Sequence, residues 1–353
     1  MSELLAENSS VELPPGRVLA IESSCDETAA AIVENGRIIH SNLVASQASL
    51  HAQYGGVFPE VASRQHIRTI FTIIDQSLKK AHVSLSDLDA IAVTRGPGLP
   101  GSLVVGMNAA KGLAIASGLP LIGVNHLEAH LYSAWLYEAG TPPKSEVEFP
   151  LLALIVSGGH TELVFMEDHS KYRSLGSTLD DAAGEAFDKV ARLLNLEYPG
   201  GPSIQKAAEE GDVEAFNFPR AWLEGSSNFS FSGLKTAVLR EVQKIKSSRK
   251  PLPVSDIAAS FQKAVVDVLV GKTIQAAEAW NAKNIVVAGG VSANRCLRQE
   301  FQYRSKLPLH IPTLEFCTDN AAMVAAAGYQ RFARGQRDDI AMDVLPNWPI
   351  SEL

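Results

Sequence analysis

The sequence predicts an α/β fold with two similar lobes that face a cleft. Three observations indicate this fold: strand-like apolar runs alternate with helix-like stretches, one strand–turn–strand pattern occurs twice, and glycine-rich turns follow several of the runs. The chain has 353 residues, of which 46% are apolar and 20% charged. This composition allows a large buried core, and the length suggests two domains.

The first half of the chain reads as strands, turns and a helix in alternation. Residues 18–21 and 29–33 are apolar runs on either side of a polar turn, which is typical of two short strands. Residues 91–94 form a third run, and a loop rich in glycine and proline follows it. We expect a helix over 103–117 and another buried strand over 120–124.

The opening pattern returns in the second half of the chain. In each copy an apolar run enters a turn of small residues that holds a serine (Ser24 or Ser157), and a threonine (Thr28 or Thr161) opens the next strand. Small residues at such a turn allow backbone N–H groups to approach a phosphate. The repeat therefore indicates two lobes with equivalent turns at the cleft.

Composition indicates where the lobes begin and end. Prolines at positions 142, 143 and 150 indicate a linker, so we expect an N-terminal lobe over 17–148 and a C-terminal lobe over 149–345. Residues 1–16 contain three glutamates and no basic residue, which fits neither a secretory signal nor an organelle presequence. We expect a disordered tail there.

Residues 285–294 form a third glycine-rich element. An apolar run enters Gly289 and Gly290, and we expect a helix to begin near Ser292. A nucleotide can lie against a helix N-terminus of this kind, although a plain strand-to-helix turn also uses glycines. Because three such elements occur in one chain, the pattern favours nucleotide contact.

Charge and cysteine content narrow the class of protein. No apolar run is long enough to span a bilayer, so we expect no membrane span. The three cysteines include no CxxC pair, so we expect the protein to work in the reducing cytoplasm. The net charge is −8, and the one dense basic stretch, 240–250, is typical of a solvated helix face. Nucleic-acid contact would therefore be local or shared with a partner.

Two histidines form a candidate metal site. His126 and His130 are four residues apart in a segment that follows a strand, so both imidazoles fall on one helical face. Buried histidines with satisfied hydrogen bonds would give the same pattern. The best candidate for a third ligand is Asp319, which would otherwise be an N-cap or a first-turn carboxylate of a helix that starts at 318 or 319. Two histidines and a carboxylate suit Zn²⁺ or Fe²⁺.

A metalloprotease is the obvious rival interpretation of this pair. Zinc proteases with the HExxH motif place the general base directly after the first histidine. Here Glu128 lies two residues after His126, which is ~200° around a helix. Glu128 should therefore point away from a metal held by the two histidines.

Ten ordered motifs connect the chain to a known family: IESSCDET, GGVFPEVASRQH, RGPGLPGSL, NHLEAH, VSGGHTEL, GEAFDKVARLL, YPGGP, FSFSGLKT, VAGGVSANRCLR and TDNAAM. Over residues 18–334 the sequence resembles the bacterial TsaD-type tRNA threonylcarbamoyladenosine transferases. The resemblance implies an actin/Hsp70/hexokinase-like (ASKHA) fold with duplicated lobes around a nucleotide cleft. We expect the helix from about 318 to pack back on the N-terminal lobe. Asn228 stands where the family pattern leads us to expect aspartate, and residues 141–148 match no motif.

The resemblance also implies the site residues. It places one divalent metal ion, Fe²⁺ or Zn²⁺, on His126, His130 and Asp319, which raises the histidine pair from an open alternative to an expectation. It places the substrate-binding strand and turn on Ile155, Val156, Ser157, Gly158 and Gly159, and further adenylate contacts on Asp188, Gly201 and Asn294. Read by itself, Asp188 would equally be a surface carboxylate paired with Lys189 or Arg192. The proton acceptor is unassigned, and Glu27 and His160 are candidates because they lie next to the turns.

The reaction implied is transfer of a threonylcarbamoyl group from threonylcarbamoyl-AMP to N6 of the adenosine beside the anticodon, in tRNAs that read codons beginning with A. The implied partners are tRNA, a TsaB-type paralogous subunit and a TsaE-type ATPase. Apolar residues within 67–74 and the helix after Gly101 are the expected docking surface. A sugar or acetate kinase, or a nucleotide-switch module, of the same fold is the alternative. Neither class needs the histidine pair.

Overall fold

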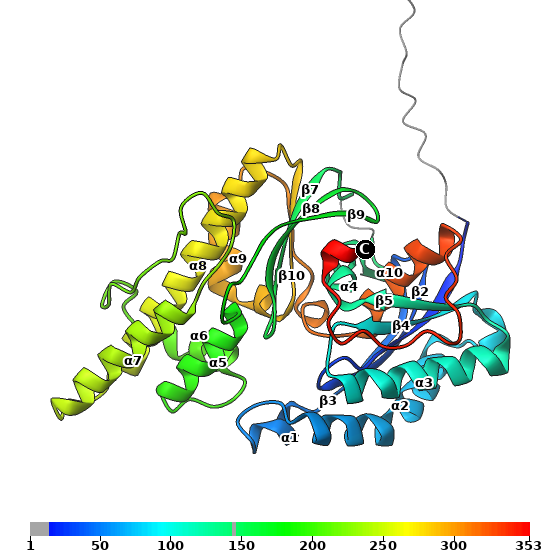
Figure 1. Cartoon of the computed structure of the whole chain (residues 1–353), viewed down its shortest axis with the longest axis horizontal. Helices are drawn as coiled ribbons and strands as arrows, with labels where there is room; N and C mark the ends of the chain where they lie inside the picture. Colours follow the sequence, from blue (N-terminus) through cyan, green and yellow to red (C-terminus); the bar gives the residue numbers. More distant parts are fainter. Residues whose placement is uncertain (1–13, 143–145) are drawn as a thin grey trace, which may run out of the picture.

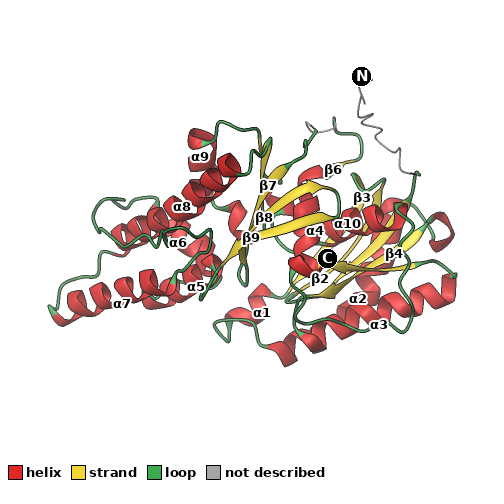
Figure 2. Cartoon of the chain, turned by 45° about the horizontal axis from the view of Figure 1, so that its top comes forward, coloured by secondary structure: helices red, strands yellow, loops and turns green. Residues whose placement is uncertain are grey.

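Two mixed sheets, one in each lobe, form the framework of the chain (Figure 1, Figure 2). The computed structural model describes residues 14–142 and 146–353. Most of the predicted tail 1–16 and the centre of segment 141–148 therefore lie outside the described residues. Gly16 is already buried, and its N–H donates to the Asn35 side chain at 2.9 Å.

The two sheets repeat one strand order. The first sheet runs β5-β4-β1-β2-β3-β6 and the second runs β11-β10-β7-β8-β9. In each, the first strand pairs antiparallel with the second and parallel with a later strand. The prediction of two similar lobes is thus confirmed. The bounds are β1 Arg17–Glu22, β2 Glu27–Glu34, β3 Ile38–Ser46, β4 Ala90–Gly96, β5 Leu121–Asn125, β6 Tyr137–Glu138, β7 Leu151–Val156, β8 Thr161–Asp168, β9 Lys171–Ser177, β10 Asn284–Ala288 and β11 Leu309–His310.

Helices cover both faces of the first sheet. Helices α2 (Pro59–Ala81) and α3 (Pro100–Ser117) pack on the outer face, and the short α1 (Ala48–Ala52) precedes α2. Helix α3 begins three residues before the predicted 103, because Pro100 suits the first helical turn, and it ends at the left-handed Gly118. Helices α4 (His126–Tyr132) and α10 (Ala321–Ala333) lie on the inner face.

The second sheet carries the remaining large helices, which are α5 (Ala183–Leu193), α6 (Gly200–Ala208), α7 (Ser232–Ser247), α8 (Val254–Ala279) and α9 (Arg295–Arg304). Their apolar faces form one core with the outer face of that sheet. A separate core joins the lobes, because residues of α4 and α10 pack together with β7 and β8. The inner helices are therefore buried between the sheets.

The end of the chain returns to the first lobe. Helix α10 contacts β1, β2 and β4, and the segment after it follows β5 and β4, with Leu345 N–H donating to the Arg95 carbonyl at 2.8 Å. The last 3₁₀ turn, Ile350–Glu352, contacts β9 of the second lobe. Among residues 14–142 and 146–353, no helix combines the length and apolarity needed to cross a bilayer.

Candidate metal centre and cleft

Helix α4 places both predicted histidines at the interface between the lobes. The Asn125 side chain caps the helix by accepting from the N–H groups of Leu127 and Glu128, as a strong N-cap residue does. All seven residues of α4 are buried, and a helix that is buried on every side needs neighbours all round. The rings of His126 and His130 meet edge to face, with centroids 4.7 Å apart.

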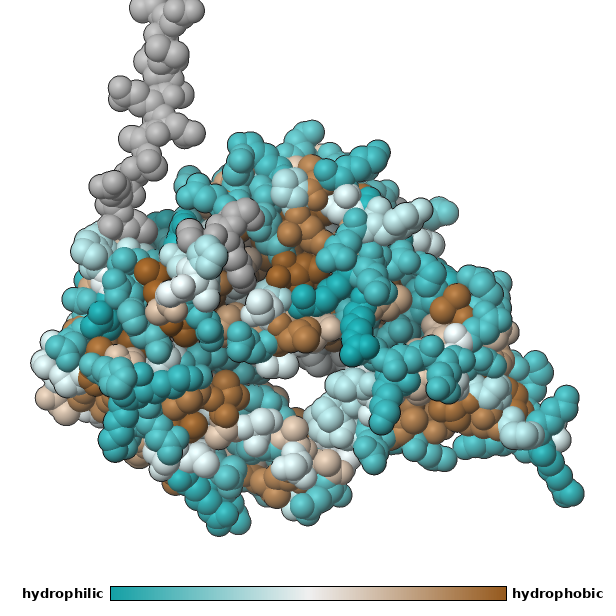
Figure 3. All heavy atoms as spheres, turned by 180° about the vertical axis from the view of Figure 1, so that it is seen from behind, coloured by the Kyte–Doolittle hydropathy of each residue, from teal (hydrophilic) through white to brown (hydrophobic). Residues whose placement is uncertain are grey.

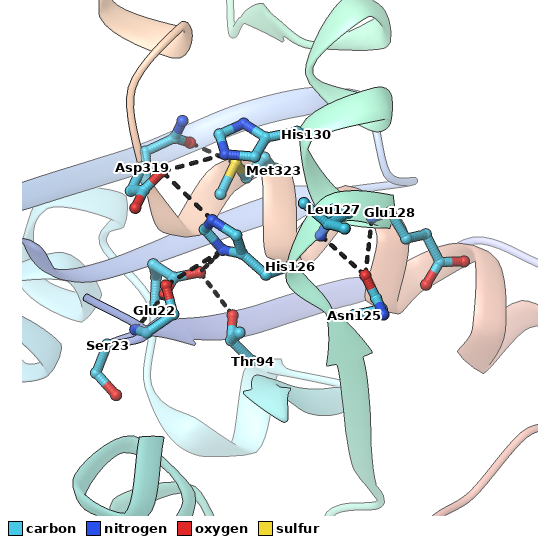
Figure 4. A network of polar contacts seen from close by, with 12 residues as sticks. Glu22, Ser23, Thr94, Asn125, His126, Leu127, Glu128, His130, Asp319 and Met323 are labelled. Carbon is cyan, nitrogen blue, oxygen red and sulfur yellow. Dashed lines mark hydrogen bonds and ion pairs between the residues drawn. The ribbon is translucent and has the colours of Figure 1, made fainter. Parts of the chain in front are cut away.

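Asp319 reaches the same point from the other end of the chain (Figure 4). Its Oδ1 lies 3.1 Å from Nε2 of His130 and 3.5 Å from Nε2 of His126. One ligand atom from each of the three residues lies within 4.8 Å of the others. The alternative role of Asp319 as a helix cap is wrong, because α10 begins at Ala321 and Asn320 caps it. The carboxylate is thus free to face the imidazoles.

Charge and burial in this group suit a cation. Burial opposes the protonated form of His126, but Asp319 and Glu22 outweigh it and raise the pKa of His126 to about 9. Burial by itself would raise the pKa of Asp319, and the neighbouring His126 and His130 instead hold it low. Since Nδ1 of His126 faces Glu22, its Nε2 can face Asp319 favourably only with a proton or a metal ion between them. The donor set therefore fits Zn²⁺ or Fe²⁺.

Glu128 does not belong to this group. Its side chain points away from both histidines (Figure 4), and its Oε2 lies 2.6 Å from Nη2 of Arg331 on α10. The Tyr172 hydroxyl donates to Oε1 at 2.7 Å. A carboxylate held in this way cannot act as general base at the metal group, so the predicted orientation is confirmed and HExxH-type protease chemistry has no support in the geometry.

A cavity of about 590 Å³ opens between the lobes beside the three candidate ligands, and the space-filling view is hollowed there (Figure 3). Both repeated turns line it. The β1–β2 turn contributes Ser24, Cys25, Asp26 and Glu27, and the β7–β8 turn contributes Ser157, Gly158, Gly159 and His160. A side chain at Gly158 or Gly159 would enter open space, so their absent side chains leave the backbone accessible from the cavity.

Some of the predicted substrate-binding residues line the cavity, and others do not. Its lining includes Asp188, Gly290 and the turn just described. Ile155 and Val156 are buried in β7 and lie behind that turn. Gly201 lies in the first turn of α6, and Asn294 caps α9 while donating to the Gln262 side chain at 2.7 Å. These four are not among the residues that line it.

Asp188 has a defined partner in the second lobe. Its Oδ1 accepts from the Gly200 N–H at 2.7 Å, and burial raises the pKa of its carboxyl. The alternative pairing is wrong, since Lys189 pairs with Asp181 and Glu185, while Arg192 donates to the carbonyl of Gly55 across the cleft. The second oxygen of Asp188 has no hydrogen-bond partner among the described residues, and Asp188 lines the cavity.

The third glycine element differs from its predicted form. After β10 the chain makes a 3₁₀ turn at Gly290–Ala293, and α9 begins only at Arg295. Gly289 has φ of +92°, and a Cβ there would lie 2.5 Å from the Val156 carbonyl oxygen. Glycine is required at this position because the backbones of β7 and β10 approach so closely.

The two candidate proton acceptors are both uncharged at neutral pH, but only one of them carries an acidic proton. Burial, together with the carboxylates of Asp319 and Asp26, raises the pKa of Glu27 to about 9. Burial, together with His126 and His130, lowers the pKa of His160 to about 4. At neutral pH His160 is therefore the one with a free lone pair, and Glu27 retains its proton unless a cation offsets its acidic neighbours.

Sequence reasoning missed Glu22. This residue ends β1 with no exposed surface, and its Oε2 lies 3.1 Å from Nδ1 of His126. A charged residue at the end of an otherwise apolar strand was the available signal, because a buried carboxylate requires specific partners.

The sequence profile of a family described as TsaD, tRNA N6-adenosine threonylcarbamoyltransferase, matches residues 38–326. A curated tRNA N6-adenosine threonylcarbamoyltransferase from Dehalococcoides mccartyi is 54% identical to the chain, over 94% of the chain and 98% of that protein. Proteins of the same description from Geobacillus thermodenitrificans and Thermomicrobium roseum are 54% and 51% identical, each over 94% of the chain and 96% of the relative.

Two solved structures share the fold at low sequence identity. HypF from T. kodakarensis aligns with a TM-score of 0.62 at 16% identity, over 91% of the chain and 48% of that protein. Component A of (R)-2-hydroxyglutaryl-CoA dehydratase from Acidaminococcus fermentans aligns with a TM-score of 0.50 at 15% identity, over 90% of the chain and 99% of that protein. The expected actin-like, two-lobed fold is confirmed.

Proposed function

The chain belongs to the tRNA N6-adenosine threonylcarbamoyltransferase family of transferases, and we propose that it forms threonylcarbamoyladenosine beside the anticodon of tRNAs that read codons beginning with A. The donor in this proposal is threonylcarbamoyl-AMP. N6 of the adenosine forms a bond to the carbamoyl carbon, the bond from that carbon to the phosphate oxygen breaks, N6 loses a proton and AMP leaves.

One observation carries the proposal: the two repeated turns, Asp188 and two of the three candidate metal ligands line the same cavity. The donor is an activated mixed anhydride, so no covalent enzyme intermediate is needed. An adenine amino group is a weak nucleophile, and the protein must align it with the carbamoyl carbon. The backbone around Gly158 and Gly159 can hold the adenylate, while Asp188 can accept hydrogen bonds from ribose hydroxyls.

We propose that His126, His130 and Asp319 hold one divalent ion, Fe²⁺ or Zn²⁺. When bound, such an ion supplies positive charge for the carbamoyl oxygen and the departing phosphate. His160 then lies in the cavity as a neutral imidazole that can accept the proton lost from N6. We propose that this reaction on tRNA takes place in the cytoplasm.

Only some of the apolar residues within 67–74 are accessible to a partner. On α2, Ile67 and Phe71 are each 64% exposed, whereas Ile70 is 2% exposed and belongs to the core. We propose that a TsaB-type subunit docks on the exposed residues of α2 and α3, alongside a TsaE-type ATPase. Phe71→Asp is the informative variant for a pull-down, because Ile70→Asp would also disrupt the core.

The test is incubation of the full chain with threonylcarbamoyl-AMP and unmodified tRNA, with and without the two partners, followed by nucleoside mass analysis. The expected product is threonylcarbamoyladenosine in equal amount to AMP. Absence of the nucleoside in the presence of both partners, or transfer of a phosphate from ATP to a sugar or to acetate under the same conditions, would overturn the proposal.

A further inference from the structure

Glu22 is a buried carboxylate that the proposed reaction does not use. It is the last residue of β1 and has no exposed surface. Three groups contact it: the Ser24 N–H donates to Oε1 at 2.5 Å, the Thr94 hydroxyl donates to Oε2 at 2.6 Å, and Nδ1 of His126 lies 3.1 Å from Oε2. Among the described residues its one ion-pair partner is His126. A buried charge held only by these groups indicates a specific task.

The contacts determine which nitrogen of His126 is available to a ligand. The carboxylate can only accept, so Nδ1 of His126 carries a proton, and Nε2 faces Oδ1 of Asp319. The Thr94 hydroxyl also donates to Oε2 and fixes the carboxylate from its other side. By contrast, Nδ1 of His130 has no hydrogen-bond partner within the described part of the chain. The Ser24 hydroxyl also lies 3.3 Å from Nδ1 of His126, but Glu22 is the nearer partner and the charged one, so it sets the orientation of the ring.

The carboxylate of Glu22 also contacts the β1–β2 turn that lines the cavity. The Ser24 N–H that donates to Oε1 belongs to the β1–β2 turn, and Ser24 and the next three residues line the cavity. The Ser24 carbonyl in turn accepts from the Leu99 N–H at the start of α3. Glu22 therefore joins the turn and the histidine through its two oxygens.

We propose that Glu22 is a positioning residue: it fixes His126 with its proton on Nδ1 and its Nε2 lone pair toward the metal, and it holds the β1–β2 turn in register with that metal. This proposal rests on the proposed metal site. Carboxylates behind metal-bound histidines act in this way, and their loss typically weakens metal binding ~10–100-fold.

Glu22→Gln is the sharpest variant because it is nearly isosteric. The Ser24 N–H always donates, so the amide oxygen must remain at the Oε1 position and the NH₂ group must face His126. That NH₂ would donate to Nδ1 and move the imidazole proton to Nε2, the nitrogen needed by the metal. Glu128→Gln is the matched control, since it changes a buried carboxylate that does not contact the metal group.

The measurement is the Kd of the full chain for Zn²⁺ by competition with a chelator, with nitrogen NMR of His126 in the zinc-loaded protein. We expect Glu22→Gln to weaken binding ~10–100-fold, Glu128→Gln to leave Kd unchanged, and wild-type His126 to carry its proton on Nδ1. Equal Kd for wild type and Glu22→Gln overturns this inference alone, whereas a wild type without stoichiometric Zn²⁺ overturns the proposed metal site. If Glu22→Gln does not fold, a proton on Nε2 in the zinc-loaded wild type still refutes the assignment.

Discussion

The ion pair between Glu128 and Arg331 connects three elements around the candidate metal group. Glu128 lies on α4 between the two histidines, Arg331 lies near the end of α10, and Tyr172 approaches from β9 in the second lobe. The side chains of Glu128 and Arg331 are 1% and 11% exposed. Arg331→Met keeps most of the apolar stem of the side chain and removes the charge.

The structure gives the expected size of the effect. Arg331 donates to Oε2 of Glu128 from Nε at 2.9 Å and from Nη2 at 2.6 Å, and without it the buried carboxylate retains only the Tyr172 hydroxyl as a donor. Breaking a buried pair from one side costs about 3–5 kcal/mol of folding free energy. In Glu128→Gln the amide oxygen still accepts from the Tyr172 hydroxyl, and the group left without its ion-pair partner is Arg331, the more exposed of the two. This variant should therefore lose about 1–3 kcal/mol of folding free energy.

The assay is urea unfolding of wild type, both single variants and the double variant, followed by tryptophan fluorescence and circular dichroism. The double variant should be more stable than the sum of the single losses predicts, with a coupling of about 0.5–3 kcal/mol. Arg334→Met, an exposed change on the next turn of the chain, is the control and should stay within about 0.5 kcal/mol. A loss below about 1 kcal/mol for Arg331→Met, or strict additivity, would refute the reasoning.

Three further changes test other parts of the structure. Asp319→Ala should abolish nucleoside formation and stoichiometric metal while the circular dichroism spectrum stays native, and a wild-type rate in the mass assay would show that the metal is not catalytic. Gly289→Ala should lower the free energy of unfolding by more than about 1 kcal/mol, because its Cβ would meet the Val156 carbonyl at a positive φ, and an unchanged melting temperature would contradict this. Burial lowers the pKa of His169 to about 4. Between about pH 6.5 and 4 the unfolded chain therefore binds a proton that the folded chain does not, so the free energy of unfolding should decrease as the pH is lowered through that window. In urea unfolding curves measured at pH 7 and pH 5, His169→Phe should lose less stability between the two pH values than the wild type does. An equal loss in both proteins would show that His169 is not the group responsible.

The repeated lobes could be predicted because their signals are local. Each buried strand is an apolar run that ends at a turn of small residues, and the second copy of the turn repeats the first within a few residues. The positions of Ser24 and Ser157 at equivalent turns follow directly from that pattern. The start of α10 was less predictable, since aspartate and asparagine both cap helices and the sequence contains them side by side.

The convergence of the candidate ligands could not be derived from spacing. Asp319 is 189 residues from His130, and no periodicity relates positions so far apart. The residues alone offered Asp319 only as a candidate, and the family resemblance made it an expectation. The same applies to Glu22, whose contact with His126 depends on two neighbouring strands, β1 and β4, and on where β5 ends. Long-range pairs of this kind are set by tertiary packing.

The alanine-rich sequence of α10 explains how Asp319, so distant in sequence, is positioned beside His126 and His130. Most of its buried positions are alanine or glycine, and a Cβ at Gly328 would lie 2.6 Å from Cβ of Ala92 on β4. Because such small residues allow close approach, the axis of α10 and the Asp319 just before it are fixed relative to β5 and α4. A metal held by His126, His130 and Asp319 would in turn bind only the packed arrangement, and its binding free energy would stabilise the contact of α10 with the first sheet. A larger side chain at Gly328, which would push α10 away from β4, should therefore weaken metal binding although it touches no ligand.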